Sequence, residues 1–322
     1  MPLTIRQVHP AFAGEVSGVD LTRPLSRDDI AAIDAGMTRY GVLVFHDQNI
    51  TDEQQLAFSR SLGPLEAKKR PGTIRKPSES RLGAGMADLS NLDKDGRIIS
   101  AEDRQWFFKL GDRLWHSDSS YAEIPAKYSL LSARVVPSWG GNTEFADMRA
   151  AYDALDDRTK AEIEELICEH SLLYSRGAIG FSEFTPEEVE DFRPVRQRLV
   201  RIQPESGRKS LFLSSHAGAI DGWTQPSSTS TRLTAELSAI RASWVATSTA
   251  RPSFANAASR ANSGAYAFAI GQSTAVKTRT RVLPLVPAIA SRGPTFGGEQ
   301  PTRVPTSVMA AIAARTKRMR SP

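Results

Sequence analysis

Two residues in the segment 114–118, Leu-Trp-His-Ser-Asp, have the types and the spacing of metal ligands. Residues i and i+2 of a strand point to the same face of a sheet, so His116 and Asp118 would converge on one ion. With a distant histidine, such a pair forms the facial triad of non-haem Fe(II) sites, which leaves coordination positions open. A surface histidine beside a solvated aspartate has the same spacing, so the pair alone does not decide between these two interpretations.

The third ligand of such a site is missing from its usual place. The chain has five histidines, and none of them follows His216. The sequence therefore supplies two thirds of an iron site and no distal histidine near the C-terminal end.

The chain divides at residue 223 into two parts of different composition. Residues 224–322 hold 13 Lys and Arg but only two Asp and Glu, a formal charge of +11 against −6 for residues 1–223. Ala, Ser and Thr make up 45 of those 99 residues, and neither helical nor strand periodicity is strong there. We predict a folded domain over 1–223 and a basic tail over 224–322. This tail is disordered, poorly patterned but folded, or translated in a shifted frame; the abrupt break favours the last.

Length and cysteine content limit the class of protein. About 220 patterned residues suit one domain with a sizeable core. No run of 18 apolar residues and no apolar signal segment is present, which argues against a membrane partner. The single Cys168 excludes an internal disulfide and is expected to pack at a helix end. We expect a cytoplasmic protein with no specific nucleic-acid partner, and we leave a homo-oligomer open.

The elements that must position the metal pair alternate between helices and strands. Capping residues predict helices that begin at Ser26, Thr51, Asp147 and Thr185, and a further helix is expected over about 158–168. Apolar runs predict strands at 42–45, 87–92, 129–136, 143–145, 199–203 and 210–214. Most of residues 68–104 read as a loop or lid. This order predicts an α+β fold around an antiparallel sheet or barrel.

Several motifs in register resemble the taurine dioxygenase and 2,4-dichlorophenoxyacetate dioxygenase family. They are the segment Leu-Trp-His-Ser-Asp-Ser-Ser at 114–120, the turn and helix of 140–155, and the segments 43–45, 58–66, 87–91 and 207–217. The resemblance runs from about residue 3 to residue 223. It implies a double-stranded β-helix (jelly-roll) core with flanking helices, incomplete at the C-terminus. It also implies an enzyme that uses Fe(II), 2-oxoglutarate and O2.

The resemblance further implies roles for individual residues. His116 and Asp118 match the first two iron ligands, and Thr143 matches the residue that hydrogen-bonds the 2-oxoglutarate carboxylate. Asn91 and His216 match positions on the substrate side of the pocket. Without the resemblance, Thr143 is a β-branched strand residue beside a turn, and His216 is a histidine that follows a strand.

A cationic loop completes the expected site. Lys68 and Lys69 lie where such enzymes hold anionic substrates, and they could draw in a carboxylate. A solvated run of charges is the commoner meaning of such a loop.

The departure from the family leaves two functions open. Members continue with a Trp-Asp-Asn-Arg-type segment, which supplies the distal histidine and then an arginine for the far carboxylate of 2-oxoglutarate. Neither pattern follows Trp223. The first function is a dioxygenase acting on a small anionic substrate, by ether cleavage of an aryloxyalkanoate similar to 2,4-dichlorophenoxyacetate. The second is an inactive truncated or frameshifted relative, whose sheets would have exposed edges.

Overall fold

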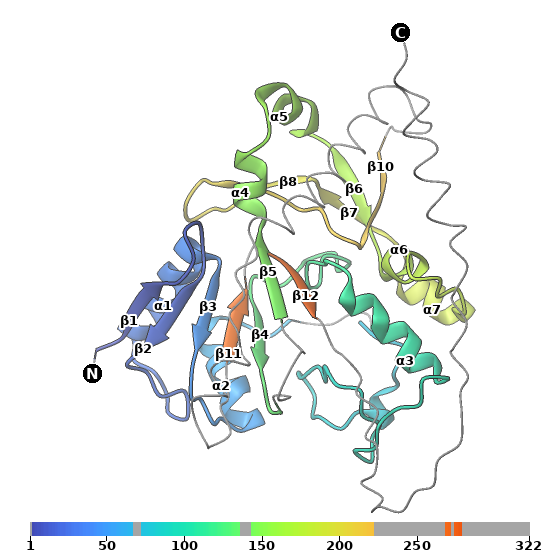
Figure 1. Ribbon diagram of the computed structural model, residues 1–322, viewed down its shortest axis with the longest axis horizontal. Helices are drawn as coiled ribbons and strands as arrows, with labels where there is room; N and C mark the ends of the chain where they lie inside the picture. Colours follow the sequence, from blue (N-terminus) through green and yellow to red (C-terminus); the bar gives the residue numbers. More distant parts are fainter. Residues whose placement is uncertain (1, 67–71, 136–142, 222–267, 272–273, 279–322) are drawn as a thin grey trace, which may run out of the picture. The chain divides into compact units, whose positions relative to one another are not determined.

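The protein is described from a computed structural model, which covers residues 2–66, 72–135, 143–221, 268–271 and 274–278 (Figure 1). These residues all belong to one compact unit, residues 1–282. Lys68 and Lys69 lie outside the described residues, as does most of the tail predicted over 224–322. No helix in the described ranges has the length and apolar character needed to cross a membrane.

Short, well-capped helices punctuate the chain. The α-helices are α1 (Arg27–Tyr40), α2 (Asp52–Leu62), α3 (Arg104–Lys109), α4 (Met148–Asp153), α5 (Asp157–Ile163), α6 (Leu172–Gly177) and α7 (Pro186–Asp191), and the 3-10 helices are η1 (Pro77–Glu79) and η2 (Leu110–Arg113). The predicted starts are confirmed, because Ser26 accepts from the Asp29 N–H and both Thr51 and Thr185 form capping boxes.

The strands form four described sheets. The strands are β1 (Thr4–Gln7), β2 (Gly14–Ser17), β3 (Val42–Phe45), β4 (Ser129–Ser132), β5 (Thr143–Asp147), β6 (Ile167–His170), β7 (Val195–Arg198), β8 (Val200–Ile202), β9 (Lys209–Leu211), β10 (Ala217–Ile220), β11 (Phe268–Gly271) and β12 (Thr274–Thr278). Their orders are β1-β2-β3-β11-β4, β10-β6-β7, β12-β5 and β8-β9. Only β2 and β3 pair in parallel among them, so the sheets are predominantly antiparallel, as predicted.

Two strands come from beyond residue 223. β11 lies between β3 and β4, with Ile270 opposite Leu43 on one side and Leu130 on the other. β12 pairs with β5, with Thr278 opposite Thr143 (Figure 1). The edges of β3 and β5 are therefore covered by these strands, although exposed sheet edges were expected from the missing family segment.

Two main apolar clusters support the site. One joins α1, α2 and β3 through Ile33, Met37, Phe45 and Phe58, and the other packs Tyr152 and Ile163 against β6, β8 and β9. A third cluster, centred on Phe108, Phe181 and Phe192, lies next to η2, which leads directly to His116.

Three local predictions were wrong. Residues 87–92 form no strand; Leu92 makes only an isolated bridge with Ile98. The helix expected over 158–168 ends at Ile163. Cys168 is buried on β6, because residues 167–170 pair with β7 and β10 as a strand. His116 is a bridge residue outside any named strand, and Asp118 begins a turn.

Candidate iron centre

His116 and Asp118 converge, although they do not share a regular strand. The His116 Nε2 atom lies 3.2 Å from Asp118 Oδ1. The chain turns directly after the pair, where Ser119 adopts a left-handed conformation with φ of 50°. The Ser119 hydroxyl accepts from the Ala126 N–H at 3.0 Å and so anchors the turn. The convergence expected from the i, i+2 spacing therefore occurs at the start of a turn and not on a regular strand.

A backbone carbonyl orients the imidazole of His116. Its Nδ1 atom lies 2.9 Å from the Leu114 carbonyl oxygen, so Nδ1–H donates there and Nε2 is left facing Asp118. A histidine ligand to a metal commonly donates its other N–H to a carbonyl or carboxylate in this way. Burial lowers the pKa of His116, but the hydrogen bond and the charge of Asp118 outweigh it, so the pKa is raised overall.

His216 lies beside this pair. The centres of the His116 and His216 rings are 5.6 Å apart, and the Tyr121 and His216 rings pack edge to face with their centres 5.2 Å apart. His216 is buried, and its Nδ1 atom contacts the Ser175 hydroxyl at 3.0 Å. Burial, with His116 and Arg176 adding to it, lowers the pKa of His216 well below its usual range. The imidazole is therefore neutral near neutral pH.

The donor set fits two of the three protein positions of an Fe(II) site. His116 Nε2 and Asp118 Oδ1 are an imidazole nitrogen and a carboxylate oxygen at one point, the ligand types such a site needs. Within the described ranges, no group of three His, Cys, Asp or Glu side chains is placed to hold a metal. The described structure therefore supplies a metal half-site and no third ligand.

The other predicted residues lie in different places. Thr143 opens β5 and is buried, 5% exposed, opposite Thr278 of β12. Asn91 lies at a bend, where its carbonyl oxygen accepts from the Ile99 N–H at 2.8 Å. The structure thus brings His116, Asp118 and His216 together, whereas Asn91 belongs to a second polar cluster near α3.

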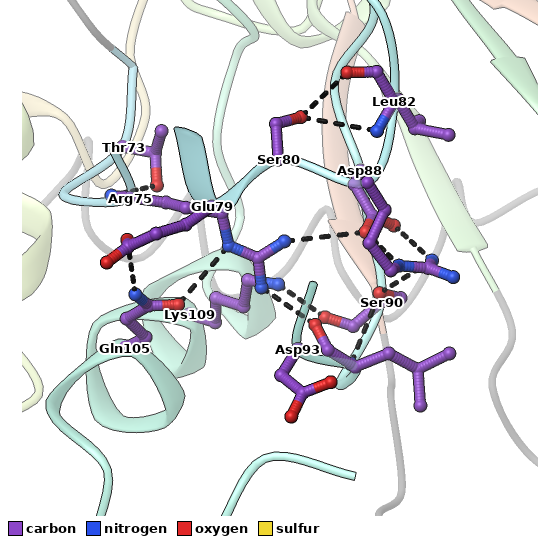
Figure 2. Close-up of polar contacts among 12 residues, drawn as sticks. Thr73, Arg75, Glu79, Ser80, Leu82, Asp88, Ser90, Asp93, Gln105 and Lys109 are labelled. Atoms are coloured by element: carbon purple, nitrogen blue, oxygen red, sulfur yellow. Dashed lines mark hydrogen bonds and ion pairs between the residues drawn. The ribbon is translucent and has the colours of Figure 1, made fainter. Parts of the chain in front are cut away.

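Figure 2 shows Arg75 and Lys109, two cations that hold the segment around Ser90. Arg75 donates to the Leu92 carbonyl at 2.7 Å, and the Lys109 ammonium donates to the Ser90 carbonyl at 2.5 Å. Asp88 lies among these cations and pairs with both Arg75 and Arg81. Burial, with Arg75 adding to it, lowers the pKa of Lys109. The carbonyls on both sides of Asn91 are therefore held by side chains from outside this segment.

The residues that contact and hold His216 were not predicted from the sequence. Tyr121 directly follows the metal motif, so its position was a usable signal. Ser175 and Arg176 lie on α6 and are brought beside η2 and β10 by tertiary packing alone.

The comparisons with known proteins fit this geometry. The chain matches the family described as taurine catabolism dioxygenase TauD, TfdA family over residues 4–242. The chain belongs to this family of dioxygenases. The predicted family and enzyme class are thereby confirmed.

Within this family, the chain is similar to two dioxygenases whose substrates are named. The chain is 40% identical over 225 residues to an alpha-ketoglutarate-dependent 2,4-dichlorophenoxyacetate dioxygenase of Cupriavidus pinatubonensis, which covers 69% of this chain and 77% of the relative. It is also 40% identical over 228 residues to a (S)-phenoxypropionate/alpha-ketoglutarate-dioxygenase of Sphingobium herbicidovorans, covering 68% of this chain and 72% of the relative.

A solved structure agrees with these matches. The crystal structure of AAD-2 in complex with Mn(II) and N-oxalylglycine superposes with a TM-score of 0.75 and 46% identity, over 87% of this chain and 93% of that chain. This match assigns the chain to the jelly-roll fold of the family. Together the comparisons confirm the predicted cofactor and cosubstrates, Fe(II), 2-oxoglutarate and O2. They give the inactive relative no support over the enzyme.

Proposed function

We propose that this chain hydroxylates a small carboxylate-bearing aromatic ether, an aryloxyalkanoate, with 2-oxoglutarate and O2 as cosubstrates and Fe(II) at the His116–Asp118 pair. The observation that carries the proposal is the pair itself: Nε2 and Oδ1 are 3.2 Å apart, and the Leu114 carbonyl fixes the histidine tautomer. The relatives that act on 2,4-dichlorophenoxyacetate and (S)-phenoxypropionate supply the substrate class.

Each residue would have a limited task. His116 and Asp118 would hold Fe(II), which supplies the chemistry of O2 activation when it is bound. Thr143, buried at the start of β5, would donate its hydroxyl hydrogen to a carboxylate of 2-oxoglutarate. The Leu114 carbonyl keeps the imidazole in place, as an outer hydrogen-bond partner of a metal ligand does.

The substrate side would use residues of different character. His216 and Tyr121 would form a wall of aromatic rings beside the metal pair. Asn91 would face the substrate from a segment that Arg75 and Lys109 hold by hydrogen bonds. Lys68 and Lys69 would supply the positive charge that attracts the carboxylate.

The overall reaction is balanced by its cosubstrates. 2-Oxoglutarate and O2 yield succinate and CO2, and the second oxygen atom becomes a hydroxyl group on the substrate. On the ether carbon of an aryloxyacetate, this hydroxylation gives a hemiacetal, which collapses to a phenol and glyoxylate. The protein contributes orientation and the exclusion of water.

We further infer a jelly-roll whose catalytic domain spans 1–223 and takes β11 and β12 from beyond that boundary. The extent of the remaining tail, an incomplete C-terminal end of the barrel and a cytoplasmic location are parts of the same proposal. Size-exclusion chromatography with light scattering would establish whether the enzyme is a homo-oligomer.

A substrate panel tests the proposal. Purified full-length chain, Fe(II), ascorbate and 2-oxoglutarate are incubated with 2,4-dichlorophenoxyacetate, 2-phenoxypropionate or taurine, and succinate and phenol are quantified. We expect succinate and phenol in equal amounts with the aryloxyalkanoates and little succinate with taurine. Succinate release that depends on taurine, without release that depends on an aryloxyalkanoate, would reassign the substrate class.

A further inference from the structure

A largely buried chain of polar contacts joins η2, which precedes His116, to α6, whose Ser175 contacts His216. Asp112 Oδ1 accepts from an Arg176 guanidinium nitrogen at 2.7 Å. A second Arg176 nitrogen donates to the Ser175 hydroxyl at 3.1 Å, and this hydroxyl contacts His216 Nδ1 at 3.0 Å. Asp112 lies on η2, four residues before His116, so Arg176 connects η2 to the serine that contacts His216.

The Arg176 side chain is held tightly in this place. It is 3% exposed, and its guanidinium carbon lies 4.4 Å from the centre of the Phe108 ring. A Cβ atom added at Gly111 would lie 2.6 Å from Arg176 Cδ, so the aliphatic part of the Arg176 side chain lies against the main chain of η2. Arg176 would have to shift to admit a side chain at position 111.

The hydrogens around Ser175 can be counted. Ser175 is fully buried, and its hydroxyl has one hydrogen and two lone pairs. It contacts the Leu172 carbonyl at 3.1 Å, which can only accept, and Arg176, which can only donate. All three contacts are hydrogen bonds at once only if Ser175 donates to Leu172 and accepts from His216 Nδ1–H. A neutral imidazole with its hydrogen on Nδ1 carries its lone pair on Nε2.

We propose that Ser175 and Arg176 are positioning residues, which hold the His216 ring with its proton on Nδ1 and its lone pair on Nε2. The part that concerns substrate rests on the proposed function, whereas the tautomer is a property of the folded chain. In this state His216 offers a ligand an acceptor and an aromatic wall, not a donor. The donors for a substrate carboxylate then come from other residues.

Nitrogen NMR of the full chain labelled with 15N-histidine tests the tautomer directly. The five histidines give a small set of signals, and His216→Gln identifies those of His216. We expect a protonated Nδ1 and an unprotonated Nε2 in the native chain. Ser175→Ala removes the acceptor of Nδ1–H, so the His216 signals should shift toward a mixture of tautomers. Protonation at Nε2 in the native chain, or unchanged signals in Ser175→Ala, would overturn the proposal.

Ser171→Ala is the matched control. Ser171 lies at the start of the same helix and is also fully buried, but its hydroxyl bonds the Phe192 carbonyl and the Leu173 N–H. Both variants lose a buried hydroxyl, and only Ser175→Ala should move the His216 signals.

Kinetics provide the second readout. Loss of one buried hydrogen bond corresponds to about a three- to tenfold effect, and we expect it as a rise in KM for the aryloxyalkanoate in Ser175→Ala, with kcat within about twofold. Ser171→Ala should leave KM unchanged. A change in kcat alone, or equal KM changes in both variants, would contradict a positioning role. If the native chain turns over no aryloxyalkanoate, the proposed function fails, while the NMR result still decides the tautomer.

Discussion

Replacing Arg149 by Met should remove a large part of the stability of this fold. Arg149 is fully buried at the start of α4, and its guanidinium makes two bonds to the Asp147 carboxylate, at 2.9 and 3.0 Å. It also donates to the Thr38 carbonyl at 2.8 Å, near the end of α1. The arginine thus ties α1 to the end of β5, the strand that begins with Thr143.

The size of the effect follows from what the substitution leaves behind. Met fills most of the space, but the Asp147 carboxylate stays buried without its cation, and the Thr38 carbonyl loses a donor. Breaking one side of a buried ion pair costs about 3–5 kcal/mol. For a chain of this size, about 2–4 °C is lost for each kcal/mol, so the melting temperature should fall by roughly 10 °C.

Urea unfolding followed by circular dichroism measures this loss, and a second substitution tests its cause. Asp147→Ser keeps an oxygen that can cap α4 but removes the charge, so the double variant with Arg149→Met should be more stable than Arg149→Met alone. A loss below about 1 kcal/mol in Arg149→Met, or a double variant that is less stable than the single one, would refute the reasoning.

Three further predictions concern the site and its surroundings. His116→Ala should weaken Mn(II) binding more than about tenfold by calorimetry, whereas His46→Ala, at a half-exposed histidine paired with Glu15, should not. Gly111→Ala should destabilise the fold by about 1–3 kcal/mol, because the new methyl group would collide with the Arg176 side chain. An unchanged free energy of unfolding would contradict this prediction. Burial lowers the pKa of His170 to about 4. The unfolded chain therefore takes up the proton first, and stability present above pH 6.5 is lost as the pH falls, by about 2 kcal/mol at pH 5. In His170→Phe this part of the loss should disappear, and equal acid sensitivity of both proteins would count against it.

Local signals predicted the helices well. Ser26, Thr51 and Thr185 cap helices through hydrogen bonds to residues within one helical turn. Both partners of each hydrogen bond therefore lie within four consecutive residues and can be recognised from the sequence. The convergence of His116 and Asp118 was predicted from spacing for the same reason. The strand expected there was wrong, because no residue pattern indicated the turn at Ser119.

Non-local pairing accounts for what the sequence did not reveal. The segment 167–170, Ile-Cys-Glu-His, continues a helical pattern, and only its partners β7 and β10 make it a strand. β11 and β12 lie in a stretch of small residues without alternation, yet they pair with β3, β4 and β5 through the backbone. Ser175 and Arg176 carry no motif, and their contact with His216 spans about 40 residues of chain.

The most direct test of the account is the stoichiometry of turnover by the full chain and by a variant that carries both His116→Ala and Asp118→Ala. The assay contains Fe(II), ascorbate, 2-oxoglutarate and 2,4-dichlorophenoxyacetate, and it quantifies succinate and the phenol. We expect equal amounts of both products from the native chain and neither product from the double variant. Native chain that folds and binds 2-oxoglutarate but releases no substrate-dependent succinate would contradict the central claim, as would equal turnover by the two proteins.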